Sequence, residues 1–205
     1  PEGKELYQSY TVKQLIEMTA SITKDFDKNK CFDFVEKFDI PLSEKVGELS
    51  NGQTTQLYMS IVLSQKVQLY ILDEPTWGLD PIVRNQILDL IRTVPLERNS
   101  VLYTSHILSE VEKIADRVAI MNKGKILEVG YLDDIKQKYC AIHVDKTKII
   151  DGYKYKTTEK ENIYIVKRKW AQENGFECEP VNFDVIFEAI VLSDKNSKDV
   201  TREGD

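Results

Sequence analysis

Apolar residues recur at helical spacing through the first third of the chain. The repeat predicts helices from Thr11 to about Asp25, from Asp27 to Phe38, and from about Ser50 to Gln65. The third helix carries an apolar stripe that would face a core, made of Leu57, Tyr58, Ile61 and Val62. Three helices in succession predict a helical subdomain.

From Leu69 onward the pattern changes to short, wholly apolar runs. Leu69–Leu72 is followed by two acidic residues, and Val101–Thr104 has a similar character, so both segments are predicted to be buried parallel strands. A helix that opens at Pro81 lies between them and carries Ile82, Ile87, Leu88 and Ile91. Strand, helix and strand over this length predict a βαβ unit with a right-handed crossover.

The rest of the chain predicts smaller elements. We expect short helices at 107–114 and 131–139, a hairpin of strands 117–121 and 125–129, strands near 142–144 and 163–166, and a helix at 183–192. The hairpin would turn through Asn122-Lys123-Gly124. Residues 193–205 are charged and almost free of apolar side chains, which predicts disorder.

Composition excludes several classes of protein. A formal charge of −6 over 205 residues, without a dense basic block, argues against a nucleic-acid partner. No apolar run approaches the roughly 18 residues that would span a bilayer. Cys31, Cys140 and Cys178 are far apart, which indicates a reduced, cytosolic setting, and two histidines argue against a zinc cluster. The start at Pro1 suggests a fragment or a processed chain.

Acidic residues and a histidine follow the two predicted strands. Ligands gather at the carboxyl ends of parallel strands, so Asp73 could hold Mg²⁺ and Glu74 could orient or deprotonate an attacking water. His106 follows the second strand, where a neutral imidazole could hydrogen-bond a phosphate or that water. The alternative for Asp73 and Glu74 is that they form an acidic strand end that merely faces solvent. The alternative for His106 is a purely structural role.

Two polar turns precede helices. In Leu49–Gln53, Ser50 can cap the helix, whose first amide groups and dipole favour an anion, and Gly52 lets the backbone come close. The alternative is an ordinary capped helix. In Pro75–Pro81, Asp80 occupies the N-cap position before Pro81.

Taken in order, these motifs resemble those of a known protein family. The sequences "LSNGQ", "LYILDEPTWGLDP", "TSH" and "EVEKIADRVAIMNKGKI", in this order, resemble the ATPase domain of ABC transporters from about Pro1 to Tyr139. The resemblance implies an α/β fold: a P-loop NTPase-type parallel sheet, incomplete in this chain, with a helical subdomain and a small C-terminal accessory segment. It divides the chain into a Q-loop remnant with the signature subdomain (1–66), a catalytic core (67–139), an accessory region (140–192) and a tail (193–205).

The resemblance also implies roles for single residues. Glu74 is similar to the catalytic glutamate, His106 to the switch histidine, and Asp73 to the acid that holds Mg²⁺. Residues that would contact ATP are Ser50, Asn51, Gly52 and Gln53 of the signature motif, Asp80 of the D-loop, and Glu2, where many members have the glutamine of the Q-loop.

Two departures from the family's pattern stand out. Asn51 replaces the first glycine of the commonest signature, a position where Asn tolerates unusual backbone angles. The chain also has no Gly-x-x-x-x-Gly-Lys-Ser/Thr loop, because Gly3-Lys4 and Gly124-Lys125 are followed by Glu5 and Ile126. We therefore expect this chain alone to bind ATP and Mg²⁺ weakly or not at all, and to turn over negligibly.

The implied function is that of an ATP-binding and ATP-hydrolysing subunit of an ABC transporter, an exporter of drug, peptide or lipid type. Its partners would be a second ATPase subunit, in a head-to-tail dimer, and transmembrane permease subunits. It would lie in the cytoplasm on the inner face of the membrane. Two alternatives remain: a truncated, non-catalytic partner that lends its signature face to an intact subunit, and a soluble ABC-type ATPase of chromosome maintenance or translation.

Overall fold

A computed structural model describes residues 6–94 and 99–199, with side chains to residue 193. The chain divides into two compact units, Pro1–His106 and Ile107–Asp205. This division falls inside the segment 67–139 that the sequence suggested as one catalytic core. The two units are described separately.

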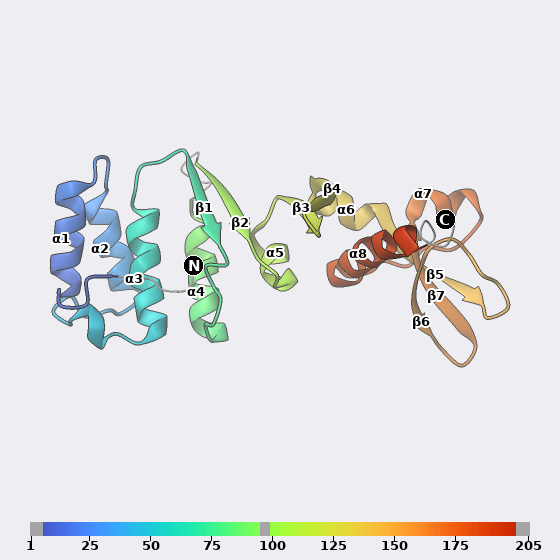
Figure 1. The fold of residues 1–205 in the computed structure, drawn as a ribbon, viewed down its shortest axis with the longest axis horizontal. Helices are drawn as coiled ribbons and strands as arrows, with labels where there is room; N and C mark the ends of the chain where they lie inside the picture. The colour runs from blue at the N-terminus through green and yellow to red at the C-terminus, as the bar shows by residue number, and fades with distance from the viewer. Residues whose placement is uncertain (1–5, 95–98, 200–205) are drawn as a thin grey trace. The chain divides into compact units, whose positions relative to one another are not determined.

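The first unit begins with a group of helices, which Figure 1 shows in blue to cyan. They are α1 (Val12–Ile22), α2 (Lys28–Lys37), the 3₁₀ helix η1 (Val46–Glu48) and α3 (Asn51–Leu63). Capping residues fix where they begin: Thr11 and Ser50 form capping boxes, and the Asp27 side chain accepts the Lys30 amide. The predicted helical subdomain is confirmed, with each helix slightly shorter than expected.

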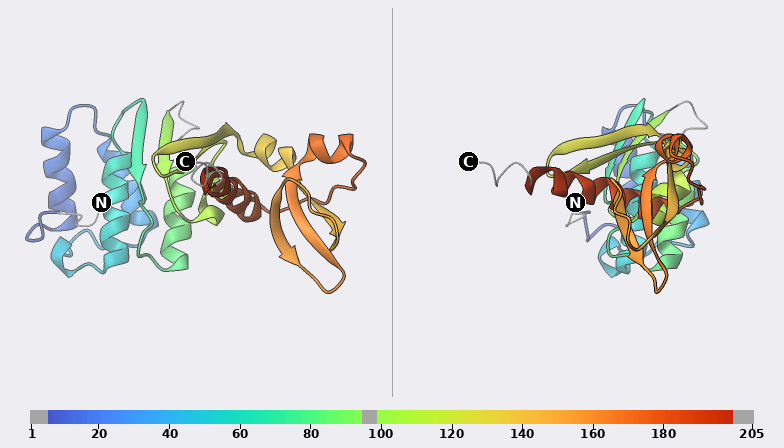
Figure 2. Two further views of the ribbon diagram at one scale, coloured as in Figure 1. Left: turned by 45° about the vertical axis from the view of Figure 1, so that its right-hand side comes forward. Right: turned by 90° about the vertical axis from the view of Figure 1, so that its right-hand side faces the viewer.

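Strands β1 (Leu69–Asp73) and β2 (Ser100–Thr104) are parallel neighbours, and α4 (Pro81–Ile91) connects them. Their register places Asp73 opposite Thr104. The predicted βαβ unit is therefore confirmed. Both views in Figures 1 and 2 show α4 beside this strand pair.

The prediction that these strands are fully buried is wrong. Tyr70 and Leu72 are buried, but Ile71 is 68% exposed and Leu102 54% exposed. Residues of a strand point alternately to its two faces, and no described element of the first unit covers the second face. Ile82 of α4 is also exposed, and the buried residues of α4 lie in its last turns.

The second unit begins with α5 (Leu108–Ile114), β3 (Arg117–Asn122), β4 (Lys125–Tyr131) and α6 (Leu132–Lys138). β3 and β4 pair antiparallel, and Asn122 lies opposite Lys125. Lys123 and Gly124 between them both have positive φ, at 46° and 74°, as a type I′ hairpin turn requires. The predicted hairpin is confirmed.

A three-stranded antiparallel sheet follows, in the order β5-β7-β6. Its strands are β5 (Tyr139–Asp145), β6 (Tyr153–Thr157) and β7 (Glu161–Lys167), and α7 (Arg168–Glu173) comes next. β6 and α7 were not predicted. β6 alternates tyrosine with lysine and is almost wholly exposed, so it adds little to the core.

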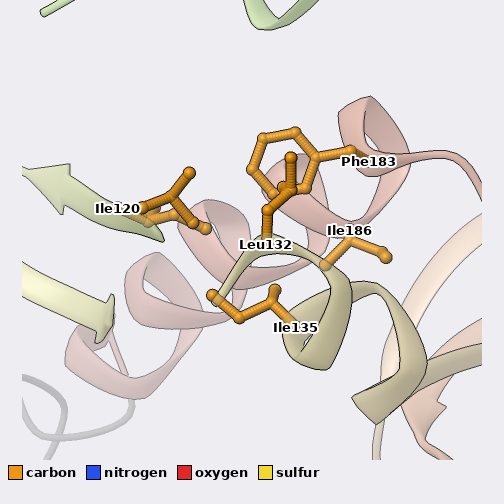
Figure 3. Close-up of a cluster of buried hydrophobic side chains, with 6 residues drawn as sticks. Ile120, Leu132, Ile135, Phe183 and Ile186 are labelled. Carbon is orange, nitrogen blue, oxygen red and sulfur yellow. The ribbon is translucent and has the colours of Figure 1, made fainter. Parts of the chain in front are cut away.

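The last helix, α8 (Phe183–Asp199), contributes to the core of the second unit. Phe183 and Ile186, one turn apart on α8, pack with Ile120 of β3 and with Leu132 and Ile135 of α6 (Figure 3). These five side chains are buried, and full burial of such a side chain contributes about 1.5–3 kcal/mol. The helix extends past its predicted end at Leu192 into the segment expected to be disordered; residues 200–205 lie outside the described part.

Among the described residues, none of the helices has the length and apolar character needed to cross a bilayer.

Candidate functional site

The carboxyl ends of β1 and β2 bring three polar groups together. Thr104 Oγ1 donates to Asp73 Oδ1 at 2.5 Å and accepts the Glu74 amide at 3.1 Å. The Glu74 amide also lies 3.2 Å from the Thr104 carbonyl oxygen. Thr104 therefore fixes both the carboxylate of Asp73 and the start of the turn that carries Glu74.

Glu74 has an unusual backbone conformation. Its φ is +44°, a left-handed value that costs a non-glycine residue of order 1–3 kcal/mol. Hydrogen bonds of the following turn hold it there, since Trp77 N donates to the Glu74 carbonyl and Leu79 N to that of Thr76. Such strain clusters at functional sites, and here it aims the Glu74 side chain toward His106.

The Glu74 carboxylate is held on one side only. Its Oε1 lies 2.9 Å from His106 Nδ1, whereas Oε2 is shielded from solvent and has no hydrogen-bond partner among the described residues. The His106 ring also packs against Trp77, with ring centroids 5.0 Å apart. A shielded acceptor without a partner is costly in the protein alone, so Oε2 suits a water or a ligand proton.

At the start of α3, by contrast, the side chains of Ser50 and Gln53 are both hydrogen-bonded. Ser50 Oγ accepts the Gln53 amide at 3.2 Å, and Gln53 Oε1 accepts the Ser50 amide at 3.0 Å. This capping box uses both side chains and leaves the amides of the first helical turn, at Asn51 and Gly52, without intrahelical partners.

Helix α4 explains the glycine in this loop. A Cβ at Gly52 would lie 3.2 Å from Val83 Cγ2, so a larger residue would press against α4. Asp80 Oδ1 fixes the start of α4 by accepting the amides of Ile82 and Val83 at 2.9 and 3.1 Å. The predicted N-cap role of Asp80 is confirmed, and Gly52 has a packing role that the sequence did not reveal.

A cavity of about 820 Å³ lies between α3 and the end of β1. Its wall is largely apolar, and its polar lining includes Asn51, Asp73, Glu74 and His106. Of the predicted site residues, Ser50, Gly52, Gln53 and Asp80 do not line it, and Glu2 lies outside the described residues. The remaining lining residues are Leu49, Thr54, Tyr58, Met59, Val62, Ile71, Leu72, Pro75, Trp77 and Gly78.

The charges in this cavity decide which ligands it suits. Its lining holds two carboxylates and no lysine or arginine, so a phosphate would need a cation between itself and Asp73. Mg²⁺ is commonly held by one or two carboxylates together with waters and substrate phosphates. The Asp73 carboxylate, oriented by the Thr104 hydroxyl, is an oxygen ligand of this kind, although no cluster of three metal-binding side chains occurs among the described residues.

Two residues of this site were missed from the sequence. Thr104 was seen only as the end of a strand, and Trp77 only as part of a turn. The position of Thr104, at the last residue of its strand and two residues before His106, could have indicated its role. A residue at that position lies at the same end of the sheet as Asp73.

No family model matches the chain. The chain is 32% identical to the ABC transporter ATP-binding protein YtrB of Bacillus subtilis over 145 residues, which are 70% of this chain and 50% of that protein. Over half to two thirds of its length, the chain is a homologue of ABC transporter ATP-binding proteins.

Further similarities agree with this homology. The chain is 35% identical to the bacitracin transport ATP-binding protein BcrA of Bacillus licheniformis, over 64% of this chain and 44% of that protein. The solved ATP-binding subunit of an ABC transporter matches with a TM-score of 0.57 and 25% identity, covering 67% of this chain and 59% of that one. The chain thus spans about half the length of the curated relatives it matches.

Proposed function

We propose that this chain is part of the ATP-binding and ATP-hydrolysing machinery of an ABC transporter. The observation that carries the proposal is the contact of Glu74 with His106 at the carboxyl end of a parallel strand pair, beside Asp73. Homology to ABC transporter ATP-binding proteins supports it independently.

Glu74 and His106 would activate the attacking water. The free Oε2 of Glu74 accepts a proton from that water, while Oε1 stays on His106. His106, packed on Trp77, keeps the carboxylate oriented through its Nδ1 and lines the same cavity. The left-handed backbone of Glu74 fixes the direction of its side chain before any ligand arrives.

Asp73 would hold Mg²⁺, with its carboxylate oriented by Thr104. When bound, Mg²⁺ neutralises charge on the transferred phosphoryl group, which the cavity's own side chains cannot do.

The start of α3 and the turn before α4 would face a second ATPase subunit. The amides of Asn51 and Gly52, with the positive end of the α3 dipole, suit a phosphate group. Ser50 and Gln53 hold that helix end in shape, and Asp80 holds the neighbouring one. Glu2 is proposed as the Q-loop residue.

The proposal also covers the protein's partners, its transported substrate and its location in the cell. Transmembrane permease subunits would receive the work of ATP hydrolysis at the inner face of the membrane, with this protein on the cytoplasmic side. Among the relatives, the names of BcrA and of the linearmycin resistance protein LnrL of Bacillus subtilis concern antibiotics. They favour export of drug or antibiotic-peptide cargo.

Phosphate release from Mg-ATP tests the proposal, with the whole reading frame that encodes this chain as the protein. Glu74→Gln should lower kcat about 10²-fold or more while ATP binding persists, because the amide keeps the shape but cannot take the proton. Glu36→Gln, the same change at an exposed position of α2 outside the cavity, is the matched control and should leave kcat unchanged. Equal kcat for wild type and Glu74→Gln would contradict the catalytic role.

Calorimetric titration of the 205-residue chain with Mg-ATP gives a second readout. We expect millimolar or weaker binding, unchanged in Asp73→Ala, because the chain carries no Gly-x-x-x-x-Gly-Lys-Ser/Thr loop. Micromolar binding that Asp73→Ala abolishes would mean that the chain's own residues build a nucleotide site of another kind. ATP-dependent association without turnover would favour the non-catalytic partner.

A further inference from the structure

Two cysteines that are far apart in the sequence meet in the second unit. Cys140 Sγ on β5 lies 2.7 Å from Cys178 Sγ in the segment between α7 and α8. Two sulfur atoms at this separation are closer than van der Waals contact. Cys140 is fully buried and Cys178 is half-buried, so Cys178 is the more exposed residue of the pair.

Backbone pairing brings the two thiols together. Ala141 and Glu179, the residues that follow the two cysteines, form an antiparallel bridge with hydrogen bonds of 2.9 and 3.0 Å. His143 strengthens the junction, because its Nε2 lies 3.2 Å from Glu179 Oε2 and its Nδ1 lies 2.5 Å from Glu161 Oε1. The fold therefore fixes the backbone on which both cysteines stand.

The surroundings of the pair are ordered and apolar. Cys140 belongs to a buried cluster against which Cys178, Trp170 and Phe176 pack. Trp170 and Phe176 stack with centroids 5.7 Å apart, and Phe176 N donates to the Ala171 carbonyl. The segment that carries Cys178 is thus held on both sides of the cysteine.

We propose that Cys140 and Cys178 form a reversible disulfide that clasps the α7–α8 segment onto β5. The bond would close a loop between positions 38 apart in sequence, immediately before α8 enters the core with Phe183. This site is separate from the residues proposed to act on ATP, and it does not rest on that function.

Exchange with a low-molecular-weight disulfide would make the bond. The Cys178 thiolate attacks one sulfur of the small disulfide, so a mixed disulfide forms and one small thiolate leaves. Cys140 loses its proton to water, its thiolate attacks Cys178 Sγ, and the second small thiolate leaves. Two cysteine thiols are oxidised by two electrons, and the small disulfide is reduced to two thiols, which take up the two protons released.

The second step should be the slow one. Burial, with a smaller contribution from the contact with Cys178, raises the pKa of the Cys140 thiol to about 12, and the nearby Arg168 guanidinium acts in the opposite direction. Because the thiolate is the nucleophile, closure should accelerate as pH rises, and the mixed disulfide on Cys178 should be seen first.

Intact-mass analysis of the 205-residue chain tests this, after incubation with oxidised glutathione and alkylation of free thiols in denaturant. We expect two of the three thiols to be protected with a net loss of two hydrogens, and a peptide that links Cys140 to Cys178. Cys31→Ala should still give the linked peptide and should take up no alkylating agent, since its two remaining thiols are those of the proposed bond. Cys178→Ser should abolish it.

Thermal unfolding gives a readout besides the mass. The oxidised chain should unfold about 5 °C or more above the same chain treated with dithiothreitol, and Cys178→Ser should show no such shift. Three alkylated thiols after oxidation, or a glutathione adduct that persists on Cys178 even at pH 9, would overturn the proposal. Both outcomes are read on the wild-type chain, so they do not depend on a variant folding.

Discussion

The two units of the chain bury their apolar surface in different ways. In the second unit, Phe183 and Ile186 close a core between α8, α6 and the β3–β4 hairpin. In the first unit, β1 and β2 are covered on one face, and Ile71 and Leu102 of the other face are more than half exposed. The candidate chemistry lies on the unit whose sheet is half covered. This chemistry thus lies beside an exposed sheet face, although the helices of the first unit are themselves well packed.

Each unit contains one tryptophan, so the stability of the two units can be measured separately by fluorescence. One of the chain's two tryptophans, Trp77, lies in the first unit beside His106, and the other, Trp170, lies in the second against Phe176. Fluorescence of Trp170→Phe therefore follows the first unit during unfolding, and fluorescence of Trp77→Phe follows the second. The predictions below use these two backgrounds.

The largest effect should come from Phe183→Ala, which empties the centre of the second core. Removing a fully buried phenylalanine typically costs 3–5 kcal/mol of the free energy of unfolding. Urea unfolding followed by Trp170 should show this loss, while the Trp77 signal should not move. Phe187→Ala, a half-buried neighbour, is the control and should cost less. Equal shifts in both signals would mean that the units unfold as one.

Ser50→Ala should have a moderate effect on the first unit, because it removes the cap of α3. Loss of a capping side chain costs about 1 kcal/mol, which the Trp77 signal should report. Thr11→Ala is a matched control, since Thr11 and Gln14 form the same capping box on α1. Both variants should lose similar stability, and only Ser50→Ala should impair ATP hydrolysis by the whole protein. Equal impairment by both would assign Ser50 a purely structural role.

The smallest effect should be a pH dependence in the second unit. Hydrogen bonding to Glu161 raises the pKa of His143 above its ordinary value, despite some opposing desolvation. A raised folded-state pKa stabilises the fold below the unfolded value of about 6.5, and this contribution is lost as pH rises through the folded pKa. Because the pair is partly exposed, the contribution should stay under about 1 kcal/mol.

Unfolding followed by Trp170 between pH 5.5 and 8.5 measures this contribution. His143→Gln, which keeps a polar side chain but cannot titrate, should flatten the dependence, and the first unit should not share it. A pH profile unchanged in His143→Gln would rule out the histidine as its source.

Sequence patterns predicted well those features that follow from periodicity and local chemistry. The caps at Ser50 and Asp80, the βαβ unit and the turn at Lys123-Gly124 depend on residues close together in the chain. Side-chain burial on β1 and β2 was mispredicted, because an apolar run shows what a strand could bury and not what covers it. β6 was missed although tyrosine alternates with lysine along it, because this short strand is almost wholly exposed and adds little to the core.

The candidate site was predictable in its main residues and not in its contacts. Asp73, Glu74 and His106 could be placed at one sheet edge from the strand pattern alone. The orienting role of Thr104 required the register of two strands, and the meeting of Cys140 with Cys178 required a bridge between positions 38 apart in sequence. The positive φ of Glu74 has no signature in the sequence, since glutamate rarely adopts it.

The contact between Gly52 and Val83 has an evolutionary consequence. Where the start of α3 touches the start of α4, the space for a Cβ at position 52 is already taken by a valine methyl group. The sizes of the two residues are therefore linked, because a Cβ at position 52 requires the valine methyl group at position 83 to move by a few tenths of an ångström. Among descendants of this sequence, the glycine in the loop and the branched residue on the neighbouring helix should be inherited as a pair.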